Sequence, residues 1–257
     1  MTTAPSRFVW YELMTSDDQA AEAFYRQVIG WQTADAGMPG MRYTLLSAGG
    51  ALIAGLMTLP QAACEAGARP GWVGYIGVAD VDAMALRLQQ AGGKLYRPPE
   101  DIPGVGRFAV VADPHGASFC LFRGNEAEQP PQPPLGTPGS VGWNELSAGD
   151  LDSAWAFYSS LFGWTTDSDM DMGERGVYRL FAAGGPAIGG MMTKPPQVPQ
   201  PGWLVYFNVE AIDAAMARVT AGGGQVLTGP MEVPGPMWTL QCLDPQGAAF
   251  AMVAPKR

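Results

Sequence analysis

The spacing of apolar and polar residues changes between two periods along the chain. Residues 8–14 form a β-rich run with alternating side chains. The next segment carries apolar residues at helical spacing, on a stripe made of Ala20, Ala21, Phe24, Val28 and Ile29. Short strand-like runs follow at 42–48 and 51–59, separated by two glycines. The pattern predicts a β-α-β-β unit with one further short strand.

Local signals predict where the first helix begins and ends. Ser16 stands in the position of an N-cap, and Gln19, three residues later, is placed to close a capping box. Gly30 follows the apolar stripe, where a left-handed C-cap favours glycine. The sequence therefore predicts a helix that starts after Ser16 and stops at Gly30.

The same plan restarts after Pro70 and is then duplicated. A strand-like run at 71–78 precedes a helical pattern at 80–93, and two strand-like runs follow across the turn "DPHG". The second half repeats the first at constant spacing: "AGGALIAGLMTLP" matches "AGGPAIGGMMTKP", and "W-x-E-L", "FY", "GW" and "DPxG" all recur. The chain thus contains four modules in two homologous domains, 1–124 and 141–257, joined by a Pro-rich linker at 125–140.

Composition limits the classes of partner and compartment. Of 257 residues, 47% are hydrophobic and 15% charged, which is enough apolar material for a substantial core. A net charge of −9 without a basic run disfavours nucleic acid and anionic membrane surfaces. The sequence shows neither a membrane-spanning apolar stretch nor a signal peptide. Three widely spaced cysteines predict reduced thiols in a cytoplasmic protein.

These motifs together resemble the vicinal oxygen chelate superfamily, which includes glyoxalase I, bleomycin-resistance proteins and extradiol dioxygenases. The resemblance covers nearly the whole chain. It implies an α+β fold in which four βαβββ modules pair into two glyoxalase-like domains with cup-shaped sheets. The modules could pair with their neighbours within a half or be exchanged across the halves. Because the duplication mimics the family's usual homodimer, we expect a pseudo-symmetric monomer.

The resemblance also implies where metal ligands would stand, and this chain departs from the pattern there. The mapped positions hold Trp10 and Trp143, Val73 and Leu204, and Cys120 and Ala251. The remaining position falls in 51–57 or 186–192, which offer no donor side chain. A divalent cation needs several converging oxygen, nitrogen or sulfur donors. We therefore expect no metal and no other cofactor in either cup.

The repeated Trp-x-Glu pairs are the leading candidate site residues. Side chains alternate along a strand, so Trp10 shares a face with Glu12 and Trp143 with Glu145. In the family that face lines the cup, while Leu13 and Leu146 would face the packed helix. Core packing for the Trp residues, and a solvated Glu or one paired with Arg42, Arg107 or Arg179, are the alternatives. A carboxylate among aromatic walls suits a general acid or base, or an anchor for a ligand.

The alternation of side chains along a strand also indicates further candidate residues. Tyr75 and Tyr206 share the facing of the mapped positions Val73 and Leu204, and Asn208 follows Tyr206 on the same face. Cys120 stands at a mapped ligand position, where a buried inert thiol is the alternative to a functional one. Tyr43 and Tyr178 also repeat, but the sequence does not fix their facing.

Two functions remain open at this point. The first is a metal-independent binder of a small planar or apolar organic molecule, with Trp10, Trp143, Tyr75, Tyr206, Asn208 and Cys120 as ligand-binding residues. The second is a glyoxalase- or dioxygenase-type enzyme, a lyase, isomerase or hydrolase, that acts on a small metabolite. It would act through Glu12 and Glu145 as catalytic residues, or through a metal site that the mapping misses.

Overall fold

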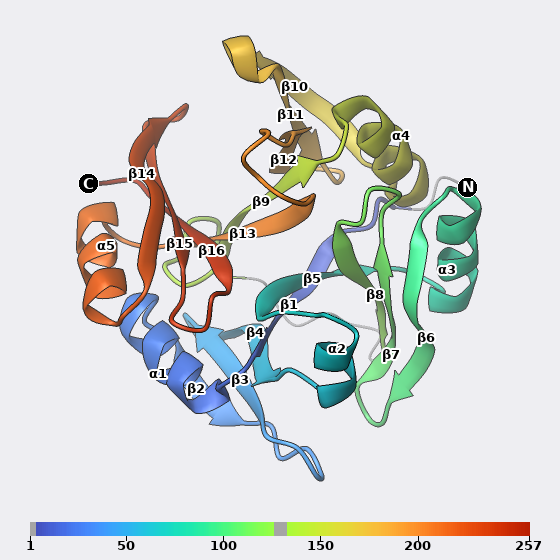
Figure 1. Cartoon of the computed structure of the whole chain (residues 1–257), viewed down its shortest axis with the longest axis horizontal. Helices are drawn as coiled ribbons and strands as arrows, with labels where there is room; N and C mark the ends of the chain where they lie inside the picture. The colour runs from blue at the N-terminus through green and yellow to red at the C-terminus, as the bar shows by residue number, and fades with distance from the viewer. Residues whose placement is uncertain (1–3, 126–132) are drawn as a thin grey trace. The chain divides into compact units, whose positions relative to one another are not determined.

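The computed structural model describes residues 4–125 and 133–257, and it contains four βαβββ modules (Figure 1). In each module a strand leads into a helix, and three further strands follow. The first module comprises β1 (Phe8–Thr15), α1 (Asp18–Val28), β2 (Gln32–Asp35), β3 (Tyr43–Ala48) and β4 (Ala51–Thr58). The short helix α2 (Gln61–Glu65) follows, and the second module then comprises β5 (Gly71–Gly77), α3 (Val81–Gln90), β6 (Lys94–Ile102), β7 (Gly106–Ala112) and β8 (Ser118–Gly124).

The second half repeats this order. The third module comprises β9 (Val141–Ala148), α4 (Leu151–Phe162), β10 (Thr165–Asp171), the 3-10 turn η1 (Gly173–Arg175), β11 (Val177–Ala182) and β12 (Ala187–Thr193). The fourth comprises β13 (Gly202–Asn208), α5 (Ile212–Ala221), β14 (Gln225–Val233), β15 (Met237–Leu243) and β16 (Ala249–Ala254). The predicted α+β fold of four βαβββ modules is confirmed. Residues 126–132 of the predicted linker lie outside the described residues.

Strand pairing shows which modules share a sheet. The two eight-stranded sheets have the orders β2-β3-β4-β1-β5-β8-β7-β6 and β10-β11-β12-β9-β13-β16-β15-β14. Each sheet therefore joins the two neighbouring modules of one half. Within each module the three strands after the helix form an antiparallel meander, and the first strand pairs in parallel with the last.

The division of the chain into two compact units, in contrast, combines modules from different halves. One unit contains residues 4–9, 74–125 and 143–204, which are mainly the second and third modules. The other contains residues 10–73, 133–142 and 205–257, which are mainly the first and fourth. Modules thus share a sheet within a half, while each compact unit draws its two modules from different halves.

The first helix corrects two details of the sequence prediction. Its N-cap is Asp17, whose carboxylate accepts the backbone N–H of Ala20 at 2.9 Å, and not Ser16. Aspartate, being charged, complements the helix N-terminus better than a hydroxyl does. Ala20 is exposed, and Tyr25 takes its place among the buried residues. Gly30 adopts φ of +90°, as the predicted C-terminal glycine requires.

A buried tyrosine–aspartate pair explains why "FY" and "DPxG" recur. In the unit of the first and fourth modules, the Tyr25 hydroxyl donates to Asp244 Oδ2 at 3.2 Å and accepts the indole N–H of Trp72 at 2.9 Å. Asp244 Oδ1 accepts the backbone N–H groups of Gln246 and Ala248, which closes the DPxG turn. The turn of one half therefore binds the helix of the other.

The unit of the second and third modules contains the equivalent contacts with the halves exchanged. The Tyr158 hydroxyl donates to Asp113 Oδ2 at 3.3 Å and accepts the indole N–H of Trp203 at 3.1 Å. Asp113 Oδ1 accepts the backbone N–H groups of His115 and Ala117, both at 2.9 Å. Burial followed by the adjacent aspartate raises the pKa of both Tyr25 and Tyr158 well above the usual value. Both phenols therefore remain protonated donors.

The tryptophans of the two "GW" motifs are also structural. Trp31 and Trp164 are 2% and 3% exposed. Their indole N–H groups donate to backbone carbonyls of the segments that enter β9 and β1, Trp31 to Gly139 and Trp164 to Ser6, both at 2.7 Å. These repeated residues position the first strand of a module, which is the strand that carries Trp-x-Glu.

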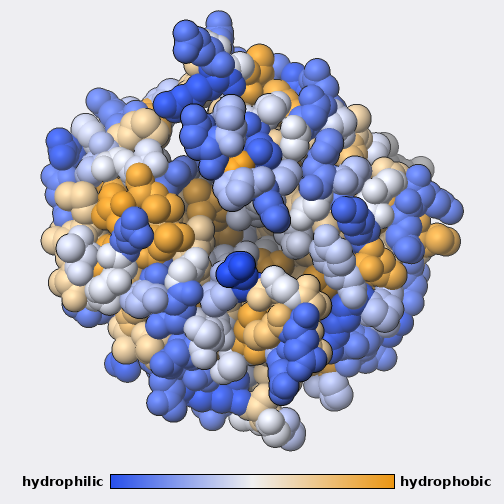
Figure 2. All heavy atoms as spheres, viewed as in Figure 1, coloured by the Kyte–Doolittle hydropathy of each residue, from blue (hydrophilic) through white to orange (hydrophobic). Residues whose placement is uncertain are grey.

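The surface is mixed in character. On the face shown in Figure 2, hydrophilic residues are interspersed with apolar patches. Exposed large apolar side chains such as Leu86 and Leu227 are scattered over different elements, which is ordinary for a folded protein. No helix of the described residues is long and apolar enough to cross a membrane.

Candidate functional site

A hydrogen-bonded cluster of an indole, a phenol and a carboxylate lies on one face of the first module. Trp10 and Glu12 come from β1 and Tyr43 from β3. The Trp10 indole N–H donates to the Tyr43 hydroxyl at 3.0 Å, and that hydroxyl donates to Glu12 Oε2 at 2.9 Å. Leu13, on the opposite face of β1, is fully buried. The period-two prediction that Trp10 shares a face with Glu12 agrees with these contacts.

The third module contains the same cluster. The Trp143 indole N–H donates to the Tyr178 hydroxyl at 2.7 Å, and Tyr178 donates to Glu145 Oε2 at 3.1 Å. Leu146 is fully buried, as its counterpart is. We call these two groups the indole–phenol–carboxylate clusters.

A repeated glycine makes each cluster possible. In the first module β4 lies between β1 and β3, and Gly55 of β4 pairs with Glu12. A Cβ atom at Gly55 would stand 1.9 Å from the Tyr43 hydroxyl oxygen, so the phenol lies directly across this glycine to reach Glu12. Gly190 pairs with Glu145, and a Cβ there would stand 2.2 Å from the Tyr178 ring. Any side chain at Gly55 or Gly190 would overlap the tyrosine and prevent it from reaching the glutamate.

Burial and charge set the protonation of the phenols. Glu12 is 7% exposed, and Glu145 is half-buried. Burial raises the pKa of Tyr43, and the negative charge of Glu12 adds to that increase. The same two causes, with Glu145 as the charge, raise the pKa of Tyr178. Each phenol thus stays protonated and donates a hydrogen bond to the carboxylate, which fixes the orientation of that carboxylate.

The sequence missed the role of Tyr43 and Tyr178, although a signal was present. Both tyrosines lie at matching positions of the repeat, as do Gly55 and Gly190. Their facing could not be fixed because Tyr43 is the first and Tyr178 the second residue of its strand, so no alternating run precedes them. A repeated glycine inside a strand indicates the close approach of another group, and that signal could have identified the phenol.

The other predicted site residues lie in the second and fourth modules, on β5, β8 and β13. In the second module Tyr75 pairs with Cys120 in the parallel register of β5 and β8, and its ring lies 6.0 Å from that of Phe122. Cys120 is 1% exposed. These residues form an apolar row, and a role for them in ligand binding stays a prediction.

The fourth module differs from the second at the positions that correspond to Tyr75 and Cys120. The Tyr206 hydroxyl accepts the side-chain amide N–H of Gln241 at 2.8 Å, and both residues align with the small Ala251. The sequence analysis did not single out Gln241, whose counterpart in the first half is Val110. Asn208 donates its side-chain amide to Ser140 Oγ at 3.0 Å, which ties β13 to the segment before β9. Whether Asn208 also contacts a ligand stays a prediction.

The arginines considered as partners for the glutamates form their ion pairs with other carboxylates. Arg42 pairs with Asp18 and Glu22, Arg107 with Asp82 and Asp101, and Arg179 with Asp169. The phenols of Tyr43 and Tyr178 donate hydrogen bonds to Glu12 and Glu145.

The mapped metal positions do not fit a divalent cation. Trp10 donates its indole N–H to Tyr43, and an indole offers no lone pair to a metal. Val73 is apolar, and the single thiol of Cys120 is buried beside Tyr75. Among the described residues no three His, Cys, Asp or Glu side chains converge in a way that could hold a metal ion.

Comparison with known proteins adds independent information. A model of the "Glyoxalase/Bleomycin resistance protein/Dioxygenase superfamily" matches residues 7–121 and 140–252. The protein named "Putative glyoxylase CFP32" of Mycobacterium tuberculosis is 36% identical over 249 residues, 96% of this chain and 94% of that protein. The "Anthracycline biosynthesis protein DauV" of Streptomyces sp. is 32% identical over 265 residues, with 97% and 94% covered.

Solved structures share the fold at lower identity. The Mn(II)-bound glyoxalase from Novosphingobium aromaticivorans has a TM-score of 0.65 and 17% identity, covering 99% of this chain and 83% of that one. A substrate complex of homoprotocatechuate 2,3-dioxygenase from Brevibacterium fuscum has a TM-score of 0.68 and 16% identity, covering 99% and 82%. These similarities concern the fold alone.

Proposed function

The chain belongs to the Glyoxalase/Bleomycin resistance protein/Dioxygenase superfamily, and on this premise we propose that it binds a small planar or apolar organic molecule at its two indole–phenol–carboxylate clusters, without a metal ion. The observation that carries the proposal is the repetition of the complete cluster, with its enabling glycine, in both halves. A core-packing role needs no buried carboxylate, because burying a charge is unfavourable unless a partner compensates for it.

The chemistry of the cluster supports an aromatic ligand with a polar edge. The indole and phenol rings offer a large, rigid contact surface, and their polar atoms are already hydrogen-bonded to each other. The carboxylate accepts hydrogen bonds, so it favours a hydroxyl or a cationic group on the ligand. Apolar walls with one oriented polar group are typical of sites for small organic ligands.

The relatives named for anthracycline biosynthesis suggest a first ligand class to test. Anthracyclines contain a fused, planar ring system with phenolic hydroxyls and carbonyls. A flat ring could stack on Trp10 or Trp143, and a phenolic hydroxyl could donate to Glu12 or Glu145. We therefore propose hydroxylated fused-ring quinones as the first compounds to examine.

The test uses 1,4-dihydroxyanthraquinone as the probe and isothermal titration as the measurement. Glu12→Gln with Glu145→Gln should weaken binding by about tenfold or more, because a hydrogen bond to a charged acceptor contributes roughly 1.5–3 kcal/mol. Glu232→Gln, which removes one negative charge from the exposed face of β14, is the matched control and should bind as the parent does. Equal affinity in the double variant and the parent would refute the assignment of the clusters.

A second candidate function is catalysis, and the oriented carboxylate is the observation that favours it. A glutamate that is buried (Glu12) or half-buried (Glu145) and oriented by a tyrosine suits a general base for a carbon next to a carbonyl group. The name of the mycobacterial relative suggests the hemithioacetal of methylglyoxal and a thiol as a first substrate. Turnover that disappears in Glu12→Gln with Glu145→Gln would support this function, and turnover that persists there would exclude these residues as the base.

The same proposal includes a compartment and an assembly state. We propose that the protein works in the cytoplasm as a pseudo-symmetric monomer. Cys64, Cys120 and Cys242 form no disulfide bond with one another, which supports a reducing compartment. The internal duplication supports a monomer because one chain already contains both copies of each module.

A further inference from the structure

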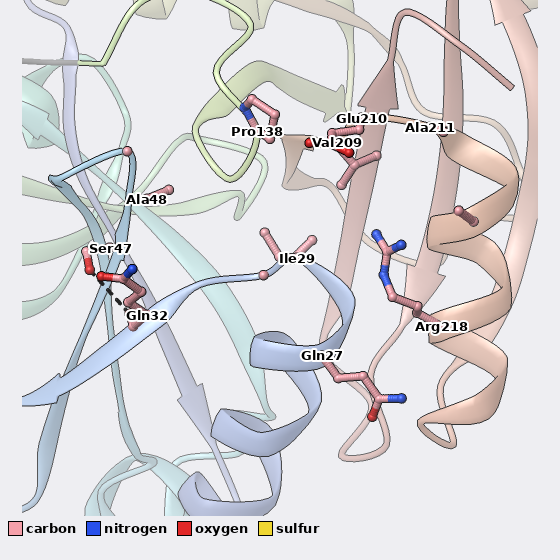
Figure 3. Close-up of a pocket in the computed structure, with 13 residues that line it drawn as sticks. Gln27, Ile29, Gln32, Ser47, Ala48, Pro138, Val209, Glu210, Ala211 and Arg218 are labelled. Carbon is pink, nitrogen blue, oxygen red and sulfur yellow. Dashed lines mark hydrogen bonds between the residues drawn. The ribbon is translucent and has the colours of Figure 1, made fainter.

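A pocket lies in the unit of the first and fourth modules, away from the indole–phenol–carboxylate cluster. Its volume is about 400 Å³, within the range of sites for small molecules. It is lined by the end of α1, the turn between β3 and β4, Pro138 and the start of α5 (Figure 3). Ala48 lines it at one end of β3, whereas Tyr43 is at the other, so about 16 Å of extended strand separates the two places.

One cation faces this pocket in a fixed orientation. Arg218 of α5 donates Nε–H to the backbone carbonyl of Val28 at 3.0 Å, which anchors the side chain at the end of α1. Figure 3 shows its guanidinium group turned toward the space between Ile29 and Val209. Among residues 4–125 and 133–257, no carboxylate lies within ion-pair distance of Arg218. Both terminal NH₂ groups therefore remain available for a planar anion.

The rest of the wall contains polar and apolar residues, and Gln27, Gln32 and Ser47 supply its uncharged polar side chains. Ile29 and Val209 are 7% and 3% exposed and form the floor, and Ala48, Ala211 and Pro138 surround it. Methyl and methylene groups at these positions favour a ligand with an apolar body. Glu210 stands at the rim as the pocket's carboxylate, so a ligand with a second negative charge would be repelled there.

Comparison with the repeat shows how the start of the helix that carries the arginine differs between the two halves. Arg87 of α3 is the counterpart of Arg218, but Asp80 stands where Ala211 does. The Asp80 carboxylate accepts the backbone N–H of Ala83 at 2.9 Å and puts a negative charge next to that helix. Ala211 has no charge, but Glu210 stands one residue earlier, where the first half has Ala79, so the carboxylate lies at the pocket rim and not at the helix cap.

We propose that this pocket binds a small organic monocarboxylate with an apolar body, and that Arg218 is the residue that recognises it. A carboxylate matches the two coplanar NH₂ groups of a guanidinium in a bidentate pair. A single negative charge fits the single cation, and the body rests on Ile29 and Val209. This proposal does not depend on the function proposed for the clusters.

The first experiment compares three benzene derivatives of similar size and different charge on the full chain, and two-dimensional ¹H–¹⁵N NMR measures their binding. Benzoate should bind with a dissociation constant on the order of 1 mM and shift the amide signals around Arg218 and Ile29. Benzamide, which is neutral, and benzylamine, which is cationic, should bind at least about tenfold more weakly, because each lacks the charge-assisted pair. Equal affinity for benzoate and benzamide would overturn the proposal.

Charge variants then assign the recognition to one residue. Arg218→Gln should weaken benzoate binding by about tenfold or more. Arg87→Gln is the matched control, since it makes the same change at the repeat-equivalent position and should leave binding unchanged. Glu210→Gln should tighten benzoate binding by removing a like charge at the rim. Unchanged binding in Arg218→Gln would refute the role of this arginine.

A steric variant keeps the test valid if removing Arg218 disturbs the fold. Ala214 lies one turn before Arg218 on the pocket-lining face of α5 and is exposed, so Ala214→Leu fills the pocket without changing any charge. Leucine is a good helix former, so the melting temperature should not fall. Benzoate binding should be lost in this variant. Retained binding with the same NMR shifts would place the ligand elsewhere and overturn the proposal.

Discussion

Replacing Gly55 by alanine should break the first indole–phenol–carboxylate cluster without touching any of its three members. The new Cβ would stand 1.9 Å from the Tyr43 hydroxyl, far inside van der Waals contact. The backbone of β4 cannot retreat, because Gly55 pairs with Glu12 on one side and Leu45 on the other. The phenol must therefore leave its place and give up its hydrogen bonds to Glu12 and Trp10.

The size of the effect follows from those two bonds. The bond from Tyr43 to the Glu12 carboxylate contributes roughly 1.5–3 kcal/mol, and the bond from the Trp10 indole roughly 0.5–1.5 kcal/mol. Alanine in place of glycine returns about 0.5–1 kcal/mol by restricting the unfolded chain. We expect Gly55→Ala to lower the free energy of unfolding by about 2–3 kcal/mol. Removing the phenol first, in Tyr43→Ala, should make the later Gly55→Ala change neutral or slightly stabilising.

Urea denaturation of the parent, both single variants and the double variant measures this coupling as a double-mutant cycle. Gly202→Ala is the control for a glycine in a strand, since a Cβ there meets no heavy atom within 4 Å among the described residues. It should leave stability unchanged or raise it by up to about 1 kcal/mol. If Gly55→Ala lowers the free energy of unfolding by the same amount with and without the Tyr43 ring, the phenol does not lie across this glycine. The proposed contacts of the cluster would then be wrong.

Three further predictions concern titration and metals. Burial and nearby carboxylates raise the pKa of four of the eight tyrosines above the usual 10, namely Tyr25, Tyr43, Tyr158 and Tyr178. Their stabilising effect is complete below pH 10 and is lost at higher pH, so phenolate absorbance should show these four titrating only as the protein unfolds. Burial raises the pKa of Cys242 to about 12, whereas Cys64 is exposed, so one thiol per chain should react rapidly with a disulfide reagent at pH 8. We also expect elemental analysis to find no stoichiometric transition metal and a chelator to leave the melting temperature unchanged; one tightly bound metal per chain would contradict the mapping.

The modules could be predicted from the sequence because their signals are local or repeated. Strand and helix periods fixed β1 and α1 to within a residue or so, and the constant spacing of "W-x-E-L" fixed the shared face of Trp10 and Glu12. The helix cap was wrong because Ser16 and Asp17 are adjacent and both are good caps, so the sequence alone could not choose between them.

The site partners could not be predicted because they come from other strands. Tyr43 reaches Glu12 across 31 residues of chain, and Tyr178 reaches Glu145 across 33. Periodicity gives the face of a residue within its own strand, but it does not give the order of strands in a sheet. The pairing of "FY" with "DPxG" was hidden for the same reason, since Tyr25 and Asp244 are 219 residues apart.

That long-range pairing leads to a prediction about the two halves as separate chains. A fragment of residues 1–125 contains Tyr25 and Asp113 but neither Asp244 nor Phe250, whose ring lies 5.2 Å from that of Tyr25. Because the DPxG turns are equivalent, a second copy of the fragment can supply Asp113 to Tyr25. We expect light scattering to show a homodimer, and Asp113→Ala to abolish it by leaving the phenol and the turn without their partner. Mixing this fragment with residues 133–257 should instead give a one-to-one complex, because the native pairs re-form. A fragment that folds cooperatively as a monomer would show that the exchange between halves is not needed for stability.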